Sequence, residues 1–263
     1  MSTPTHPPVD APGTDTPPLI IPRAPRMPVS AGHGLQRVVV FGGAGAIGHR
    51  LSIEAATRGH HVTVVTRSSG PLPHRACARI QGDMAEPIVV EHLARQADVV
   101  VCAVGPDTSG GGARPFRRVM ETVIDHLVGT RLIVIGCAGT LLRPDGRAIN
   151  GHRHTRDHAE VLQDLHLAPA YVNWTCLTPP PVLTAHPRTG QYLTGTHTPA
   201  GLSVSIADLA VALVDEIELP AHPRARFTVA AHPRTNTPTG AAHRGITPRL
   251  APGPAPVKSD PTE

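Results

Sequence analysis

Short, continuously apolar runs alternate along the chain with longer segments of helical periodicity. The apolar runs are rich in β-branched residues and predict strands over 38–41, 61–66, 78–81, 98–104, 131–135 and 170–175. Between them, apolar positions at helical spacing predict helices over 47–58, 86–96, 114–127 and 154–165. Strands that lack an alternating polar face are buried on both sides, which is typical of a parallel sheet covered by helices.

The pattern changes after residue 177, where Pro179, Pro180 and Pro181 interrupt it. Beyond them we expect a short strand over 190–194, a helix over 206–218 and a last strand over 227–229. Ser205, three residues before Asp208, has the spacing of a capping box at the start of that helix. The predicted fold class is therefore α/β: a Rossmann-type, doubly wound parallel sheet in three layers, with a small C-terminal extension on the substrate side.

Both ends of the chain are rich in proline and lack an apolar period. Such segments bury too little apolar surface to offset the entropy of ordering them. We therefore predict disordered tails over 1–35 and 232–263, and one nucleotide-binding domain over 36–231.

Composition narrows the function classes. The net charge of +4 comes from scattered arginines, and no basic block is interleaved with aromatic residues, so we expect no binding to nucleic acid. No apolar run is long enough for a membrane span. The cysteines form no C-x-x-C pair, and we expect reduced thiols in a cytoplasmic protein whose partner is a small-molecule substrate. They are Cys77, Cys102, Cys137 and Cys176.

A glycine motif lies between the first predicted strand and the first predicted helix. Gly42, Gly45 and Gly48 fit G-x-x-G-x-x-G, and with Gly43 the run also fits G-x-G-x-x-G. Glycine permits a tight turn and close approach of the backbone to a ligand, and the helix N-terminus offers unpaired N–H groups to phosphates. The order strand, glycine turn, helix predicts a dinucleotide site.

The residues after the next strands predict how the dinucleotide is bound. Arg67, with Ser68, follows the second strand in a stretch (61–75) without any acidic residue, which favours the 2′-phosphate of NADP over NAD. The alternative is a solvated surface arginine. Asp83 either accepts from the adenine amino group or closes a turn before the next helix. Val104 and Gly105, after the fourth strand, are expected beside the ribose and nicotinamide.

The glycine motif and several further segments together resemble the atypical short-chain dehydrogenase/reductases. The similar segments are 62–69, 82–83, 135–139, 174–179, 190–192, 205–208 and 226–230. Within that family the likeness is to the NAD(P)H-binding subfamily, with its NmrA-like and biliverdin reductase B-like members, and it covers about residues 36–231. The resemblance implies cofactor contacts at Gly42, Gly45, Ala46, Ile47, Arg67, Asp83, Val104 and Gly105.

The catalytic pattern of the orthodox family members is absent. They donate a proton from a Tyr-x-x-x-Lys pair, whereas the only lysine of this chain is Lys258 in the C-terminal tail. Cys137 stands where that resemblance expects a serine, and it is a candidate substrate contact or else a small buried hydrophobe. Thr140 is a second candidate contact.

Three histidines near the start of a predicted helix raise the alternative of a metal site. Two imidazoles four residues apart, as in His154 and His158, can chelate zinc, and His152 is close in sequence. Without an H-E-x-x-H motif, a solvated helix start is the favoured interpretation, and we predict no metal.

Taken together, the sequence predicts an NAD(P)H-binding oxidoreductase, a reductase or an epimerase-like enzyme, that transfers hydride to or from a small molecule. The alternative is a non-catalytic NADP(H) sensor of NmrA type, which the missing Tyr-x-x-x-Lys pair favours.

Overall fold

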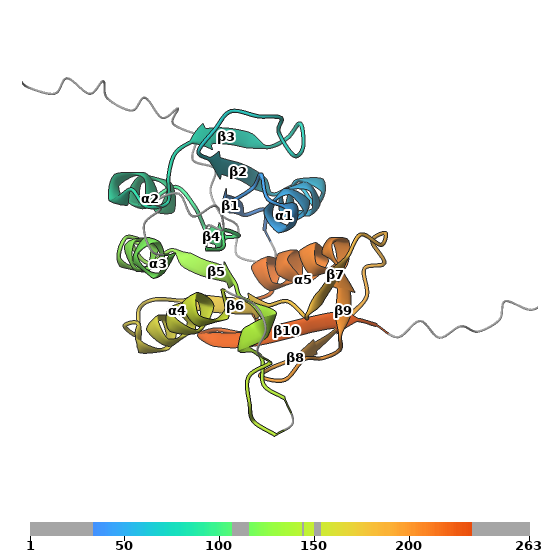
Figure 1. Cartoon of the computed structure of the whole chain (residues 1–263). Coiled ribbons are helices and arrows are strands. Elements are labelled where there is room, and N and C mark those ends of the chain that lie inside the picture. Colours follow the sequence, from blue (N-terminus) through green and yellow to red (C-terminus); the bar gives the residue numbers. More distant parts are fainter. Residues whose placement is uncertain (1–33, 107–115, 144, 150–153, 233–263) are drawn as a thin grey trace, which may run out of the picture. The chain divides into compact units, whose positions relative to one another are not determined.

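The computed structural model describes residues 34–106, 116–143, 145–149 and 154–232. In this part of the chain, eight strands form one sheet in the order β3-β2-β1-β4-β5-β6-β10-β8 (Figure 1). Their bounds are Arg37–Phe41 (β1), His61–Thr66 (β2), Ala78–Gln81 (β3), Val99–Cys102 (β4), Arg131–Ile135 (β5), Trp174–Thr178 (β6), Tyr192–Gly195 (β8) and Ala225–Ala231 (β10). All neighbours pair in parallel except β8, which is antiparallel to β10. The tails predicted to be disordered lie, apart from residues 34, 35 and 232, outside the described residues.

Helices cover both faces of the sheet. Their bounds are Ala46–Thr57 (α1), Pro87–Ala94 (α2), Phe116–Asp125 (α3), Thr155–Leu167 (α4) and Ile206–Glu218 (α5), and Ala138–Thr140 forms a 3₁₀ turn (η1). In β1, Val39 and Phe41 enter the apolar core beneath α2, α3 and α4. Val38 and Val40 enter the opposite core beneath α1 and α5. Because both faces are covered (Figure 1), the strand is apolar throughout, and the predicted three-layer Rossmann-type fold is confirmed.

The predicted sixth strand starts four residues too early. It was expected over 170–175, whereas β6 is Trp174–Thr178. The preceding residues form a turn, in which the N–H of Val172 donates to the carbonyl of Pro169 at 2.9 Å. Arg224 donates to the carbonyls of Ala168, Pro169 and Val172, each at 2.8 Å. These hydrogen bonds come from a residue far away in sequence and occupy the carbonyl groups of the turn. The turn is therefore not part of strand β6.

The extension after β6 contains two short strands that the periodicity does not predict. β7 (Val182–Thr184) and β9 (Ser203–Ser205) pair in parallel as a separate two-stranded sheet. The described residues contain no helix that is both long and apolar enough to cross a bilayer.

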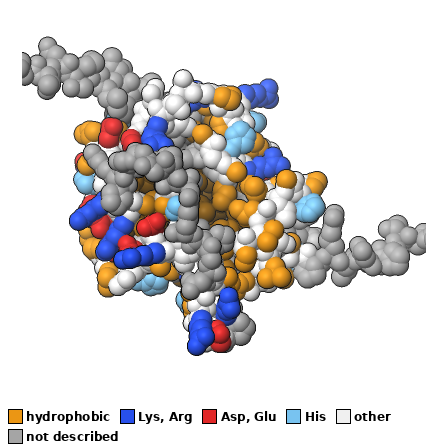
Figure 2. Space-filling model, in the orientation of Figure 1, with side chains coloured by type: hydrophobic (Ala, Val, Ile, Leu, Met, Phe, Trp, Pro, Cys, Tyr) orange, Lys and Arg blue, Asp and Glu red, His pale blue; other side chains and the backbone are white. Residues whose placement is uncertain are grey.

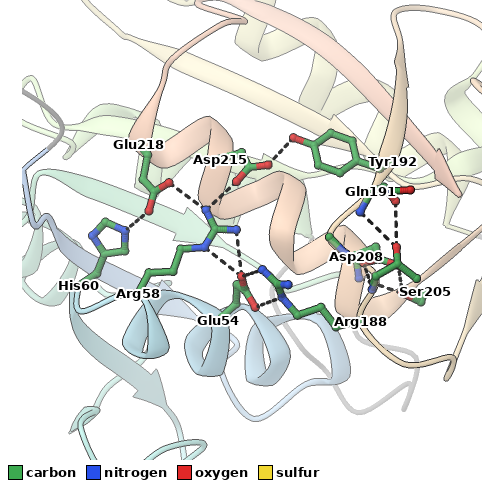
Figure 3. A network of polar contacts seen from close by, with 12 residues as sticks. Glu54, Arg58, His60, Arg188, Gln191, Tyr192, Ser205, Asp208, Asp215 and Glu218 are labelled. Carbon is green, nitrogen blue, oxygen red and sulfur yellow. Dashed lines mark hydrogen bonds and ion pairs between the residues drawn. The ribbon is translucent and has the colours of Figure 1, made fainter. Parts of the chain in front are cut away.

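The capping box at the start of α5 is confirmed at its serine. The backbone N–H of Asp208 donates to the Ser205 hydroxyl at 2.9 Å. The Asp208 carboxylate accepts from the Ser205 hydroxyl at 2.8 Å and from the N–H groups of Thr189 and Gly190 at 2.7 and 2.8 Å (Figure 3). Burial alone would raise the pKa of Asp208, but these hydrogen bonds lower it. The cap therefore also fixes the segment that leads into β8.

Replacing this cap tests its contribution to stability. We expect Ser205→Ala to lower the free energy of unfolding by about 1–2 kcal/mol, because one helix-end N–H loses its acceptor. Urea denaturation followed by circular dichroism measures the change. Ser69→Ala, at an exposed loop position, is the control and is expected to leave the midpoint unchanged. Equal midpoints for the two variants would contradict the capping role.

An ionic network joins α1 to α5 (Figure 3). The guanidinium of Arg58 contacts Glu54 and Glu218, both at 2.9 Å, and Asp215 at 2.6 Å. Arg188, before β8, donates twice to Glu54 at 2.9 Å. Each acidic side chain of this network contacts an arginine, so the network serves to pack the two helices against each other.

Candidate cofactor site

Parallel pairing brings the carboxyl ends of β1 to β5 to one edge of the sheet. β1 lies between β2 and β4, with β3 outside β2 and β5 outside β4. The residues one or two positions after these strands therefore gather at that edge, which is where open α/β sheets bind their ligands. They are Gly42, Arg67, Asp83, Val104 and Cys137. The structure thus brings together the predicted phosphate, ribose, adenine and nicotinamide positions.

The turn after β1 requires glycine at two positions. Gly42 has a φ of 81°, and a Cβ there would lie 2.7 Å from the carbonyl oxygen of Ala103 and 2.8 Å from a methyl carbon of Val104. A Cβ on Gly48 would clash with the carbonyl of Gly42. β1, the loop after β4 and the first turn of α1 thus approach one another as closely as backbone allows, which is the geometry expected of a dinucleotide turn.

The first turn of α1 presents unpaired N–H groups at this edge. Gly45 is the N-cap residue and Ala46 the first helical residue, and both are exposed. Ile47 follows, partly buried. The N–H groups of a helix's first turn have no partner within the helix, and this turn carries no acidic side chain to compete for them. The partial positive charge of the helix N-terminus adds to their attraction for an anion.

Arg67 and Ser68 lie exposed just beyond β2. Only their backbone is held in place: the Gln81 amide donates to the carbonyl of Arg67 at 3.1 Å, and the Thr66 hydroxyl donates to that of Ser68 at 2.8 Å. Among the described residues, the Arg67 guanidinium has no partner. It is therefore available to a ligand phosphate.

Asp83 follows β3 and closes a turn. The Oδ1 of Asp83 accepts from the backbone N–H of Ala85 at 2.9 Å. The backbone carbonyl of Asp83 accepts from the backbone N–H of Glu86 at 3.1 Å. This is the turn role that the sequence left open. It does not conflict with the adenine role, because the turn engages only one carboxylate oxygen, Oδ1.

The candidate catalytic residues after β5 differ in how far they are engaged. The Thr140 hydroxyl donates to the carbonyl of Cys137 at 2.8 Å, and the carbonyl of Thr140 accepts from Arg226 at 2.8 Å. Thr140 is thus held inside the protein.

Burial raises the pKa of Cys102 to about 12 and that of Cys176 to about 11, so both stay thiols. All four cysteines are described and free, and three are buried whereas Cys137 is partly accessible.

Neither tyrosine supplies a proton at this edge. Tyr171 is 74% exposed and precedes the amino end of β6. The hydroxyl of Tyr192 donates to Asp215 at 2.6 Å (Figure 3). Burial and the Asp215 carboxylate raise the pKa of Tyr192 well above its usual value.

The extension supplies an apolar border. Pro179 and Pro180 are buried directly after β6, and β7 follows them. Val182 is 50% exposed, and Leu202, whose carbonyl accepts from the N–H of Val182 at 3.1 Å, is 77% exposed. Figure 2 shows apolar side chains gathered near the middle of the molecule in this view, beside β7.

Two polar residues that the sequence did not assign to the cofactor site also face this edge. Thr155 and His158 lie on one face of α4, opposite Gly139 and Gly105 respectively. His158 was considered only as a metal ligand. No group of three or more metal-ligating side chains occurs among the described residues, and His152 lies outside them. Thr155 and His158 lie beside the site because of how α4 packs on the sheet, and no local sequence motif indicates that packing.

Comparisons with known proteins identify the family of this chain and proteins of the same fold. A family model described as NAD(P)H-binding matches residues 42–220. The uncharacterized protein YwnB of Bacillus subtilis is 27% identical over 215 residues, which are 74% of this chain and 98% of YwnB. A putative NADH-flavin reductase from Streptococcus pneumoniae has a TM-score of 0.65 and 23% identity, covering 75% of this chain and 100% of the other. A short-chain dehydrogenase/reductase from Veillonella parvula, in complex with NADP, has a TM-score of 0.59 and 20% identity, covering 76% and 96%.

At these identities the structural likeness shows the Rossmann fold. The family match is more specific, because it begins at the first glycine of the turn after β1 and extends through α5, over more than half of the chain. The chain therefore belongs to the NAD(P)H-binding family.

Proposed function

We propose that this protein is an NADP(H)-dependent oxidoreductase that reduces a small molecule by hydride transfer. The observation that carries the proposal is the turn after β1, where Gly42 and Gly48 leave room for backbone alone and the N-terminus of α1 is open. When bound, the cofactor supplies the hydride. The protein has to bind and orient both reactants, for which the edge of a rigid sheet is suited.

The preference for NADP over NAD is the finer part of the proposal. The Arg67 guanidinium has no described partner, and no acidic residue lies between positions 61 and 75 to bind a ribose hydroxyl. The Veillonella parvula protein of the same fold was solved with NADP. We place the 2′-phosphate beside Arg67 and Ser68, and the adenine beside Asp83.

At the nicotinamide end we propose that Val104 and Gly105 line the ribose and ring. Cys137, which is partly accessible, contacts the substrate there. Thr140 is the weaker candidate, because its hydroxyl hydrogen is directed to the carbonyl of Cys137. The free cysteines suit a reducing, cytoplasmic setting.

Binding and turnover test the proposal separately. Isothermal titration calorimetry with NADPH, NADP⁺, NADH and NAD⁺ should show binding, tightest for the phosphorylated pair. NADPH oxidation, followed at its near-ultraviolet absorbance, is then measured with FMN, menadione and a panel of small aldehydes and ketones. We expect at least one of these acceptors to be reduced, and a protein that binds none of the four nucleotides would refute the proposal.

A non-catalytic NADP(H) sensor is the second candidate, and the missing Tyr-x-x-x-Lys pair favours it. Binding without turnover of any acceptor, together with a partner protein whose affinity depends on the redox state of the cofactor, would support the sensor. Turnover at a rate that rises with protein concentration would exclude a purely non-catalytic role.

Charge reversal at Arg67 tests the 2′-phosphate contact. We expect Arg67→Glu to weaken NADPH binding by about 10- to 100-fold, the loss expected for one charge-assisted hydrogen bond, and to change NADH binding far less. Arg118→Glu, an equal charge change on the exposed surface of α3, is the control. Equal losses for NADPH and NADH in the calorimeter would show that Arg67 does not contact the 2′-phosphate.

A further inference from the structure

The first turn of α4 holds two polar side chains, Thr155 and His158, that make no side-chain hydrogen bond to another described residue. The hydroxyl oxygen of Thr155 is buried and has no hydrogen-bond partner in the described part of the chain. It faces Gly139 so closely that a Cβ there would clash with it. His158, one turn further, points its Nε2 toward Gly105: a Cβ on that glycine would have Nε2 as its nearest neighbour, at 3.8 Å. Gly139 and Gly105 follow β5 and β4, so both side chains border the proposed nicotinamide end.

The surroundings of His158 keep its ring uncharged. The imidazole packs on the Phe116 ring at a centroid distance of 5.0 Å and an angle of 57°. Burial lowers its pKa to about 4; Asp157 acts in the opposite direction and His154 in the same direction. At neutral pH the ring therefore has one N–H donor and one lone pair. Among the described residues, neither ring nitrogen has a hydrogen-bond partner.

A histidine buried only as part of the core normally directs its ring nitrogens to protein acceptors or donors, since an unmade hydrogen bond in a buried place costs about 1–3 kcal/mol. His60 illustrates this, with Nδ1 accepting from the N–H of Gln36 at 3.1 Å and Nε2 3.1 Å from Glu218. His158 differs in being only partly buried and in pointing Nε2 toward Gly105, at the edge where the cofactor and its substrate are expected. An uncharged imidazole in such a place can polarise a carbonyl group.

We propose that His158 is a further catalytic residue, whose Nε2–H donates a hydrogen bond to the carbonyl oxygen of the substrate beside the nicotinamide. The proposal rests on the proposed function. The hydride brings two electrons that form the new C–H bond, and the π pair of the C=O bond moves onto the oxygen. His158 stabilises the charge on that oxygen, which then takes its proton from water. Thr155 lies on the same face of α4 as His158, opposite Gly139, which follows β5.

Nuclear magnetic resonance of the imidazole ring tests the placement without requiring turnover. In ¹⁵N-labelled protein, with the ring signals assigned through bonds, we expect NADP⁺ to shift the His158 signals. The signals of His166, on the last turn of α4, should stay in place. The His158 ring should also give the shifts of a neutral imidazole at every pH above about 5. If calorimetry shows NADP⁺ binding while the His158 signals do not move, the inference is overturned and the proposed function stands.

Two variants test the hydrogen bond itself, with menadione and the best carbonyl acceptor of the panel. His158→Phe keeps an aromatic ring against Phe116 but removes the donor, and we expect a kcat about 10- to 100-fold lower with unchanged NADPH affinity. His158→Gln, which keeps an N–H group, should recover part of the rate. His166→Gln is the control and should retain full activity. An unchanged kcat in His158→Phe would overturn the inference alone. If the wild-type protein does not bind NADPH, the proposed function and the inference are both overturned.

Discussion

Gly42→Ala is expected to abolish measurable NADPH binding and to lower the free energy of unfolding by roughly 2–4 kcal/mol. The φ of 81° at this position is unfavourable for any residue with a side chain. The added methyl group would also lie 2.7 Å from the carbonyl oxygen of Ala103, a backbone atom of the neighbouring segment. Relief of that contact has to move the turn or the loop after β4, and either movement displaces the N–H groups that face the diphosphate.

Urea denaturation and calorimetry with NADPH measure the two effects. Gly70→Ala is the matched control, because Gly70 has no atom within 4 Å of the added methyl group and no positive φ. There we expect unchanged binding and a stability equal to that of the wild type or up to about 1 kcal/mol higher, since alanine restricts the unfolded chain. Retention of NADPH affinity in Gly42→Ala would mean that the dinucleotide does not bind at this turn.

Arg131→Met is expected to lower the free energy of unfolding by about 3–5 kcal/mol, because it removes the guanidinium that contacts a buried carboxylate. Arg131, at the start of β5, contacts the Glu216 carboxylate at 2.6 Å, and their side chains are only 8% and 3% exposed. It also donates to the main-chain carbonyl of Glu216 at 2.7 Å. The same carboxylate accepts from the ring of His222 at 2.7 Å, so its removal from water is compensated by several partners.

A surface ion pair provides the control for this loss. Arg117→Met, which breaks the exposed pair with Asp164, should change the free energy of unfolding little, because water solvates the carboxylate that is left. Urea denaturation followed by circular dichroism measures both variants. Equal destabilisation by the two variants would contradict the importance of burial.

Much of the architecture follows from local patterns. The run 38–41 could be recognised as a buried strand because its side chains are apolar on both faces, and the glycines after it because only they permit the turn. The cap at Ser205 depends on a spacing of three residues. The sixth strand was misplaced because the turn before it is held by Arg224, more than fifty residues away in sequence.

The candidate site divides in the same way. Positions within two residues of a strand end, such as Arg67 and Asp83, could be placed at the ligand edge because the carboxyl ends of parallel strands lie together. Whether a side chain there is free was not predictable: the Thr140 hydroxyl is directed inward to Cys137, whereas the Arg67 guanidinium has no described partner. His158 was considered only with its neighbours in sequence, and its nearness to Gly105 came from the packing of α4.

By itself, the sequence determined the strand and helix pattern, the glycine turn and the absence of a Tyr-x-x-x-Lys pair, because each depends on residues close together in the chain. Only the tertiary structure decided that β8 pairs antiparallel with β10, that Arg131 neutralises Glu216 at a separation of 85 residues, and that His158 faces the end of β4. Those contacts join segments far apart in the chain, and the strand pairing and helix packing that bring them together leave no periodic signal in either partner.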